Sequence, residues 1–278
     1  MSANHTTSGA ATTADVLQEI AETFVRARLS AGSLNAYPGP APTDLDMAYR
    51  IQDRAIELWP DTLKGWKVGR IPPAVEDEFG CDRLAGPIFE KSIRRQPNGN
   101  VADMPVFSEG FAAIEAEFVA VIAKDAPAGK VEWSRDEAEA MIGELRIGLE
   151  VASSPLAAIN ELGPAVTASD FGNNAGLVVG PTIPDWSSRD PETMTCKAFI
   201  DERLSGEGGA YRLTGGVTRS VQFMLELAAK RGRPLRAGDY IATGQTSGIH
   251  EVTPGQSARI RFGDDGELTC KLVAAKKH

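Results

Sequence analysis

The amino-acid sequence predicts an α+β protein, in which a helical N-terminal segment leads into a β-rich body. Two stretches before residue 61 carry apolar side chains at the spacing of an amphipathic helix. Beyond residue 112, short runs of β-branched and aromatic residues alternate with turn residues, which is typical of strands. The 278 residues suffice for one large domain or two small ones. We expect a tail at residues 1–12, a helical segment that ends in a loop at 13–100, and a β-rich body at 101–278.

The N-terminal segment is expected to hold two helices. Residues 1–12 are rich in Ser, Thr and Ala, and they predict a disordered tail. The first helix is predicted from Thr13, because apolar residues follow at helical spacing, namely Val16, Ile20, Phe24 and Val25. The second helix follows three prolines, is capped by Thr43 or Asp44, and ends before Pro60.

Most of the remaining chain is expected to form strands. A short strand is predicted at 65–69, and the Pro, Gly and charged residues of 70–100 predict a loop with short pieces of structure. Further strands are expected at 113–123, 145–152, 174–180, 195–203, 239–244, 257–262 and 267–274. Helices are expected at 135–143 and 217–231, the second ending at Gly232. Hairpins are predicted to turn at 264–266 and at 206–209.

Composition and charge limit the classes of function. A net charge of -9 and a pI near 5.0 argue against binding to nucleic acid or to an anionic membrane surface. The three cysteines are widely spaced, which argues against a disulfide framework or a zinc site. The sequence shows no secretory signal pattern and no apolar run of the ~20 residues needed to span a bilayer. We therefore expect a soluble cytoplasmic protein.

Three glutamates in strand-like surroundings are the strongest chemical signal. Glu115 and Glu117 lie one residue apart in an apolar run, so on a strand they share a face, about 6.6–7 Å apart. Glu150 occurs in a similar apolar run. Three carboxylates without His or Cys favour a hard divalent cation such as Mg²⁺ or Mn²⁺. The alternatives are the solvent face of an edge strand, or a salt bridge from Arg146 to one of the three.

A lysine between two glycines is a second candidate. Lys67 lies between Gly65 and Gly69 and has apolar neighbours on both sides. Glycines permit close approach of a ligand, and a lysine in apolar surroundings can bind a carboxylate or act as an acid or base. The alternative is a surface lysine on a short strand.

Two polar clusters lie at the ends of predicted strands. Residues 169–175 (SDFGNNA) are predicted either to bind a ligand or to form an Asx-type turn. Residues 242–248 (ATGQTSG) are predicted either to hold an anion on backbone N–H groups or to form an ordinary Gly-rich loop. The only central histidine is His250, which argues against a histidine-based metal site or catalytic triad.

The chain resembles the 2-keto-4-pentenoate hydratases and 4-oxalocrotonate decarboxylases of the fumarylacetoacetate hydrolase superfamily over about residues 43–274. The landmarks of that family occur here in order. They are Ala48-Tyr49-Arg50-Ile51-Gln52, Lys67-Val68-Gly69, Phe79-Gly80, Ile114-Glu115-Ala116-Glu117, Gly148-Leu149-Glu150-Val151, Asp170-Phe171-Gly172-Asn173-Asn174-Ala175, and Gly238-Asp239 followed by Thr243-Gly244. The loop after Phe79-Gly80 departs from the family pattern and leaves Asp82 as the nearest counterpart of its acidic residue.

The resemblance implies a mixed β-roll or sandwich body, similar to the C-terminal part of fumarylacetoacetase. It implies that 101–278 is the metal-binding catalytic body and that 13–100 contains a substrate loop. The implied ligands of Mg²⁺ or Mn²⁺ are Glu115, Glu117 and Glu150. The implied catalytic residues are Lys67 and Asp82, and the implied substrate-binding residues are Lys67, Arg70, Asn174, Thr243, Gly244 and Gln245. The resemblance also implies a homo-oligomer and leaves open a complex with a pathway partner.

The function expected from this resemblance is hydration of a 2-hydroxy-2,4-dienoate or 2-oxo-enoate to a 4-hydroxy-2-oxo acid, in the degradation of aromatic compounds. Decarboxylation of a 2-oxo acid of the 4-oxalocrotonate type is the alternative. Hydrolytic C–C cleavage of a diketo acid comes third, together with a non-catalytic subunit that stabilises a pathway enzyme. A metal-dependent rise in thermal stability would separate an enzyme from such a subunit, because only a native-state metal site produces it.

Overall fold

The computed structural model describes residues 12–96 and 100–277. The helices are α1 (Thr13–Ser30), α2 (Leu45–Leu58), α3 (Glu76–Phe79), α4 (Arg135–Glu139), α5 (Pro164–Ser169) and α6 (Gly216–Lys230). The strands are β1 (Leu63–Arg70), β2 (Arg83–Phe89), β3 (Ile93–Arg95), β4 (Ala102–Val106), β5 (Phe111–Ile122), β6 (Ile142–Ser154), β7 (Asn174–Thr182), β8 (Thr195–Ile200), β9 (Arg203–Gly209), β10 (Tyr240–Gln245), β11 (His250–Glu251), β12 (Ser257–Phe262) and β13 (Gly266–Ala274).

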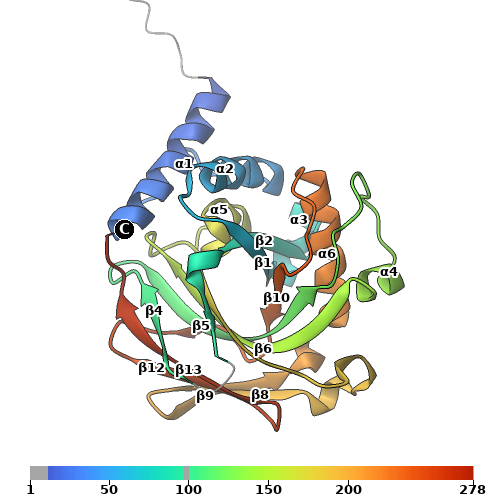
Figure 1. Cartoon of the computed structure of the whole chain (residues 1–278). Coiled ribbons are helices and arrows are strands. Elements are labelled where there is room, and N and C mark those ends of the chain that lie inside the picture. The colour runs from blue at the N-terminus through green and yellow to red at the C-terminus, as the bar shows by residue number, and fades with distance from the viewer. Residues whose placement is uncertain (1–11, 97–99, 278) are drawn as a thin grey trace, which may run out of the picture.

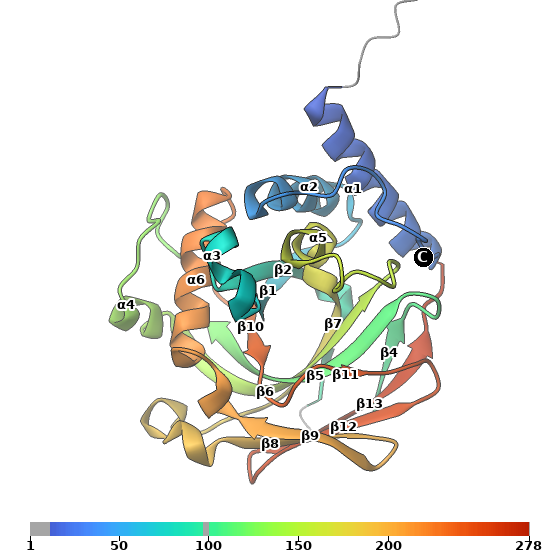
Figure 2. The ribbon, with the colours of Figure 1, turned by 180° about the vertical axis from the view of Figure 1, so that it is seen from behind.

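Two mixed sheets form the body of the molecule (Figure 1). The larger sheet has eight strands in the order β2-β1-β10-β5-β6-β7-β3, with β11 added beside β5, and it curls into a roll. The smaller sheet has the order β4-β13-β12-β8-β9 and packs on the side away from α1 and α2, as the view from behind also shows (Figure 2). The pairs β1–β10, β3–β7 and β4–β13 are parallel, and the other pairs are antiparallel. The predicted α+β class and rolled β-body are therefore confirmed.

The N-terminal helices begin where their caps predict. Thr12 accepts the backbone N–H of Asp15 and completes a capping box with that residue, so α1 starts at Thr13. Asp44, rather than Thr43, caps α2 by accepting the N–H of Met47. The predicted disordered tail lies outside the described residues, except for Thr12. Among the described residues, none of the helices is long and apolar enough to cross a membrane.

The two faces of the larger sheet contact different surroundings. Phe118 on β5 packs edge-to-face on Phe262 of the smaller sheet, with ring centroids 5.5 Å apart, so this face belongs to the main core. The opposite face of β5, inside the roll, carries Glu115, Glu117 and Val119, because alternate residues of a strand share a face. A small apolar cluster lines the roll beside these glutamates and consists of Ile88, Ile93, Val119, Leu177, Val179 and Ala242.

Several predicted elements differ from the observed ones. Residues 70–100 were expected to form mainly a loop, but β2 is a fully buried strand that pairs along the whole of β1. A strand buried on both faces lacks the alternation of apolar and polar residues that marks a strand in a sequence, and Gly86-Pro87 obscures this one further. The helix expected at 135–143 ends at Glu139, since β6 begins at Ile142.

The second predicted hairpin turns at a different place. Residues 206–209 are part of β9, and the turn between β8 and β9 lies at Asp201 and Glu202. Both residues have positive φ values, 47° and 62°. The glycine-rich sequence of β9 therefore serves close packing: a Cβ on Gly208 would lie 1.9 Å from the carbonyl oxygen of Thr246. The hairpin at 264–266 and the end of α6 before Gly232 are confirmed.

Candidate metal centre

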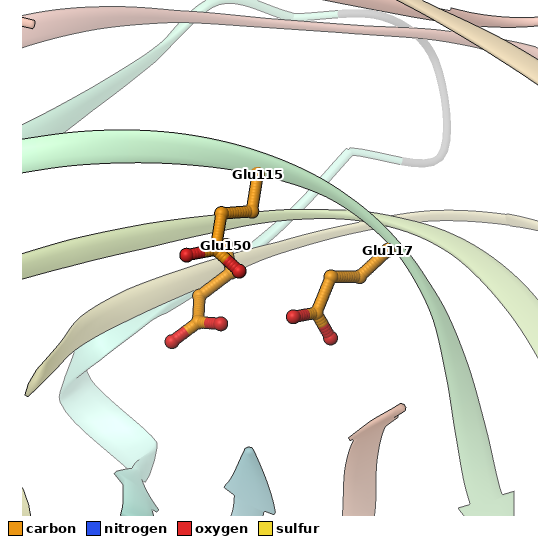
Figure 3. Close-up of side chains that lie close together, drawn as sticks. All are labelled: Glu115, Glu117 and Glu150. Atoms are coloured by element: carbon orange, nitrogen blue, oxygen red, sulfur yellow. The ribbon is translucent and has the colours of Figure 1, made fainter. Parts of the chain in front are cut away.

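The three predicted glutamates meet inside the roll. Glu115 and Glu117 lie on β5, and Glu150 lies directly opposite Glu115 on β6 in the antiparallel register. All three side chains are buried, with exposed fractions of 5%, 0% and 0%. One carboxylate oxygen from each lies within 4.8 Å of those of the other two, and Figure 3 shows the three carboxylates converging. Two oxygen ligands on opposite sides of one cation are about 4.0–4.2 Å apart for Mg²⁺ and about 4.6–5.2 Å apart for Ca²⁺, so the three oxygens are close enough to share an ion.

One buried cation balances only part of this charge. The Nζ of Lys67 lies 3.5 Å from Glu150 Oε2, and the lysine side chain is 6% exposed. Burial alone would lower the pKa of Lys67, but the carboxylates of Glu150, Glu115 and Glu117 outweigh it and raise that pKa above its usual value. Lys67 is therefore a fixed positive charge, and three carboxylates with one ammonium group leave an excess of negative charge in the roll.

The carboxyl groups respond to this excess as buried acids do. Burial raises the pKa of Glu115 to about 7, against the opposing effect of Lys67. Burial, followed by repulsion from Glu150 and Glu115, raises the pKa of Glu117 well above its usual value. Two buried oxygens, Oε1 of Glu117 and Oε2 of Glu150, have no hydrogen-bond partner among the described residues. Buried carboxylate oxygens that accept no hydrogen bond, beside charge that one lysine leaves uncompensated, are what a hard divalent cation would neutralise, so the residues present fit Mg²⁺ or Mn²⁺.

Two neighbouring strands orient the glutamates. The backbone N–H of Gly244 donates to Glu117 Oε2 at 3.0 Å. The register of β10 with β5 is irregular between Ala242 and Gln245, and Gly244 has a φ of 117°, a conformation that few other residues adopt. On the other side, the amide of Asn174 donates to Glu150 Oε1 at 2.9 Å. Such partners fix the direction of ligand oxygens before a metal binds.

The residue opposite Glu117 is a glycine, and close packing requires it. Gly148 pairs with Glu117 across β5 and β6, and a Cβ there would lie 2.4 Å from a methyl carbon of Val119. No side chain can therefore stand beside Glu117 at this position. Arg146, two residues earlier, bonds to Glu144 at 2.7 Å and to the carbonyl of Gly180, so the predicted alternative of a salt bridge from Arg146 to the three glutamates is wrong.

The predicted substrate-binding residues fall into two groups. Asn174 and Gly244 reach the centre, but each contacts a glutamate. Thr243 donates its hydroxyl to the carbonyl of Phe118, and its own carbonyl accepts the hydroxyl of Ser220, so it ties β10 to β5 and α6. Gln245 accepts the backbone N–H of Gly248 through Oε1 and closes the following turn. Contact of these residues with substrate stays a prediction.

The structure does not bring Arg70 and Asp82 to the glutamates. Arg70 is three residues beyond Lys67 on β1, so the strand pleat directs it to the opposite face, where it pairs with Glu76 at 3.4 Å. Asp82 pairs with Arg83. Asp82 lies four residues before Gly86, and Gly86 is the residue that pairs with Lys67. Four residues of an extended chain span about 13 Å. A catalytic role for Asp82 stays a prediction that needs a movement of this segment.

A buried network behind the centre was missed by the sequence analysis. Arg28 on α1 donates to both carboxylate oxygens of Asp170, at 2.6 and 2.9 Å, and to the carbonyl of Asn174 at 3.1 Å. Ser154 donates its hydroxyl to the same carboxylate at 2.6 Å. The network therefore holds Asn174, which in turn bonds to Glu150. An arginine on an amphipathic helix gives no signal that it is buried, because its partner lies 142 residues further along the chain.

A comparison with protein families matches residues 91–276 to the fumarylacetoacetate hydrolase C-terminal family. The matched region includes the three glutamates, Asn174 and Gly244, and it begins after Lys67.

Two curated proteins illustrate the range of relatives. The TodF product hydratase of Pseudomonas putida is 25% identical over 249 residues, which cover 84% of this chain and 86% of the hydratase. The 4-hydroxyphenylacetate degradation bifunctional isomerase/decarboxylase of Salmonella dublin is 28% identical over 96 residues. That match covers 34% of this chain and only 21% of the bifunctional protein.

A solved structure matches nearly the whole chain. It is the 4-oxalocrotonate decarboxylase from Pseudomonas putida complexed with magnesium and adipate. The TM-score is 0.77 at 19% sequence identity, and the match covers 95% of this chain and 100% of the decarboxylase. At this identity the match establishes the fold.

Proposed function

This chain belongs to the fumarylacetoacetate hydrolase C-terminal family, and on that premise we propose that it is a divalent-metal-dependent hydratase of a 2-hydroxy-2,4-dienoate or 2-oxo-enoate. The product would be a 4-hydroxy-2-oxo acid. A hydratase is among the relatives whose sequences match most of this chain, and the three buried glutamates supply the metal site that the proposal requires. The observation that carries the proposal is this excess of buried carboxylate charge, which one lysine leaves unbalanced.

Glu115, Glu117 and Glu150 would hold the cation, Mg²⁺ or Mn²⁺. The solved decarboxylase with the same fold is complexed with magnesium, which supports this choice. When bound, the cation would supply Lewis-acid stabilisation of negative charge on the oxygens of a 2-oxo acid. Gly244 and Asn174 keep one oxygen of Glu117 and one of Glu150 occupied, so Glu117 Oε1 and Glu150 Oε2 would be the oxygens available to the ion.

Lys67 would bind the substrate and hold a proton near it. Its ammonium group is the cation that faces Glu150, and the carboxylates raise its pKa, so it is protonated at neutral pH. It can therefore attract the substrate carboxylate or an enolate oxygen, and it can donate a proton. It is not suited to act as a neutral base in this state.

The interior of the roll suits a substrate with a polar head and a short apolar chain. Carboxylates and Lys67 occupy one part of the interior face, and the cluster of Ile88, Val119 and Leu177 lies beside them. A 2-oxo acid would place its two oxygens on the charged part and its alkenyl carbons on the apolar part. The apolar surface excludes water around the charges and strengthens their interaction with the substrate.

Decarboxylation of a related 2-oxo acid is the second candidate, because the matches to decarboxylases cover part of the sequence and nearly all of the fold. Hydration and decarboxylation need the same oxygen ligands and the same cation beside the substrate carboxylate. They differ in the fate of that carboxylate, which no residue described above decides.

The test is incubation of the Mg²⁺-loaded protein with 2-hydroxypenta-2,4-dienoate and, separately, with 2-oxohex-3-enedioate. Loss of the dienol absorbance without release of CO₂ is expected with the first compound. Release of CO₂ from the second compound, with no turnover of the first, would reverse the order of the two candidates. No turnover of either compound by metal-loaded protein would refute both.

A further inference from the structure

A cavity whose lining includes Asn174, but none of the candidate metal ligands, is not used by the proposed reaction. It encloses about 630 Å³ between α1, the segment after α2, the start of β7 and the C-terminal end of β13. None of the three glutamates lines it, nor does Lys67. Its volume is in the range of small-molecule sites in proteins, about 300–1,000 Å³.

The wall of this cavity contains an aromatic cluster. The ring centroids of Trp59 and Phe89 are 5.6 Å apart, those of Trp59 and Phe171 are 5.6 Å apart, and those of Phe89 and Phe171 are 5.2 Å apart. Phe107 also lines the cavity, and the guanidinium of Arg28 lies between Phe107 and Phe171, at 5.7 and 5.0 Å from the two ring centroids. Such a wall favours a flat apolar group, which can pack against the faces and edges of the rings.

The cavity also has a strongly positive lining at its exposed parts. Lys91, Arg94, Lys276 and Lys277 line it, and none of the four forms an ion pair with a carboxylate among the described residues. The one acidic residue in the lining is Asp61, which accepts the backbone N–H groups of Thr62 and Lys91. A concentration of positive charge on a protein with a net charge of -9 attracts anions to this cavity.

We propose that this cavity binds a small carboxylate that carries a flat apolar group, such as an arenecarboxylate. The ring would lie against Trp59, Phe89 and Phe171, and the carboxylate would lie toward Arg94 and Lys276. The aromatic wall is combined with cations that form no ion pair with a carboxylate among the described residues, although Lys91 and Arg94 donate to backbone carbonyls. This combination selects the class over a neutral arene, which gains nothing from the charges, and over an inorganic anion, which gains nothing from the rings.

The bound carboxylate would act on the metal centre through Asn174. This residue lines the cavity, its carbonyl accepts from Arg28, and its amide donates to Glu150. A ligand that holds Asn174 in place would hold Glu150 in place as well, and metal affinity would rise. Linkage requires the metal to raise the affinity for the carboxylate by the same factor. This coupling depends on the proposed metal site, whereas binding in the cavity does not.

The experiment is a calorimetric titration of metal-free protein with 4-iodobenzoate, with 4-iodobenzamide as the uncharged probe. We expect binding of the carboxylate and at least tenfold weaker binding of the amide. The double variant Arg94→Gln/Lys276→Gln should weaken binding of the carboxylate about tenfold. If that variant does not fold, Lys91→Gln/Lys277→Gln takes its place and should weaken binding by the same factor. Arg203→Gln/Lys271→Gln removes the same charge outside the cavity and should leave affinity unchanged.

A crystal soaked in 4-iodobenzoate locates the ring through the anomalous signal of iodine. Iodine against Trp59 and Phe171 supports the proposal. Iodine only beside the three glutamates, equal affinity for the amide, or occupation of the cavity by a second copy of the chain would overturn it. Glu117→Gln separates the two proposals, because it should abolish metal binding and leave 4-iodobenzoate binding intact. Equal Mn²⁺ affinity with and without 4-iodobenzoate would overturn the coupling through Asn174.

Discussion

At the scale of single residues, Glu117 is the carboxylate with the least compensation. It is fully buried, one of its oxygens accepts the N–H of Gly244, and the other has no partner among the described residues. Burial also raises the pKa of Glu117 above its usual value, so the metal-free protein pays in stability to ionise it.

We predict that Glu117→Gln abolishes activity and Mn²⁺ binding but does not lower the thermal stability of the metal-free protein near neutral pH. The amide keeps the shape of the side chain and replaces a carboxyl group that is costly to ionise in the metal-free protein. Melting curves and calorimetric Mn²⁺ titrations measure both effects. Glu144→Gln on β6 is the matched control, since Glu144 bonds to Arg146 outside the centre, and it should retain Mn²⁺ binding. Full activity in Glu117→Gln would contradict the assignment.

Lys67 is predicted to act on the substrate rather than on the metal. Lys67→Gln should lower kcat/KM by about 10²-fold or more, the usual effect of losing an acid–base group. Mn²⁺ affinity should not fall, because removing a positive charge 3.5 Å from Glu150 relieves repulsion of the cation. Paired measurements of kcat/KM and Mn²⁺ affinity check this. A loss of Mn²⁺ affinity that accounts for the loss of turnover would show instead that Lys67 supports the metal site.

The raised pKa values predict how pH affects the metal-free protein. The pKa of Glu115 is about 7 in the folded protein, whereas a pKa of 4.5 is usual in the unfolded chain. Between these two pH values the folded protein therefore binds more protons than the unfolded chain. Stability from this group is present at low pH and is lost as the pH rises from 4.5 through about 7. Metal ligands must be deprotonated, so Mg²⁺ should offset the loss. Melting temperatures with and without Mg²⁺ should differ more at about pH 8 than at about pH 5.5, and Glu115→Gln should reduce this dependence, because Glu117, whose pKa is also raised, still contributes to it. An Mg²⁺ effect that does not change with pH would contradict the prediction.

The meeting of the three glutamates was partly predictable from single residues, but their hydrogen-bond partners were not. The i, i+2 spacing of Glu115 and Glu117 fixes a shared face once a strand is assumed. The bonds from Gly244 and Asn174 depend on how β10 pairs with β5 and how β7 pairs with β6, and both ladders have irregular registers there. An irregular register has no marker in the sequence of either strand, so the sequence did not show these bonds. The resemblance implied that Asn174 and Gly244 bind substrate, which stays a prediction.

At the scale of elements, one buried ion pair joins the N-terminal helix to the body. Arg28 and Asp170 are 5% and 1% exposed and bond at 2.6 Å. We predict that Arg28→Met lowers the free energy of unfolding by about 3–5 kcal/mol, because it leaves a buried carboxylate without its partner. Arg28→Met/Asp170→Asn should recover part of the loss. Urea denaturation of the four proteins of this cycle measures the coupling, and additive effects of the two changes would contradict it.

The predictability of an element depended on what its sequence shows locally. α1, α2 and α6 were predicted because each segment shows apolar periodicity, with a cap before α2 and the stop residue Gly232 after α6. The strand β2 was missed because its burial on both faces removes the alternation of polar and apolar residues. The turn between β8 and β9 was misplaced because Asp201 and Glu202, rather than the glycines that follow, have positive φ values.

At the scale of the whole molecule, the segment 13–100 and the rest of the chain build one sheet. β1 lies between β2 and β10 in the order of the larger sheet, and its Lys67 pairs with Ala242. The resemblance to a known family implied the rolled body, since no local pattern shows that strands so distant in sequence are neighbours. The position of Lys67 beside Glu150 therefore follows from the topology, and neither motif alone predicts it.

The central claim is that one divalent cation on Glu115, Glu117 and Glu150 is required for turnover of a dienol or enone of a 2-oxo acid. The most direct test is a titration of EDTA-treated, desalted protein with Mn²⁺, in which Mn²⁺ binding and consumption of 2-hydroxypenta-2,4-dienoate are followed together. We predict no turnover before Mn²⁺ is added, and activity that rises in step with binding until one ion is bound per chain. Full turnover in the metal-free protein would contradict the claim. Unchanged binding of Mn²⁺ by Glu117→Gln would contradict it as well, because the ion would then be bound by other residues.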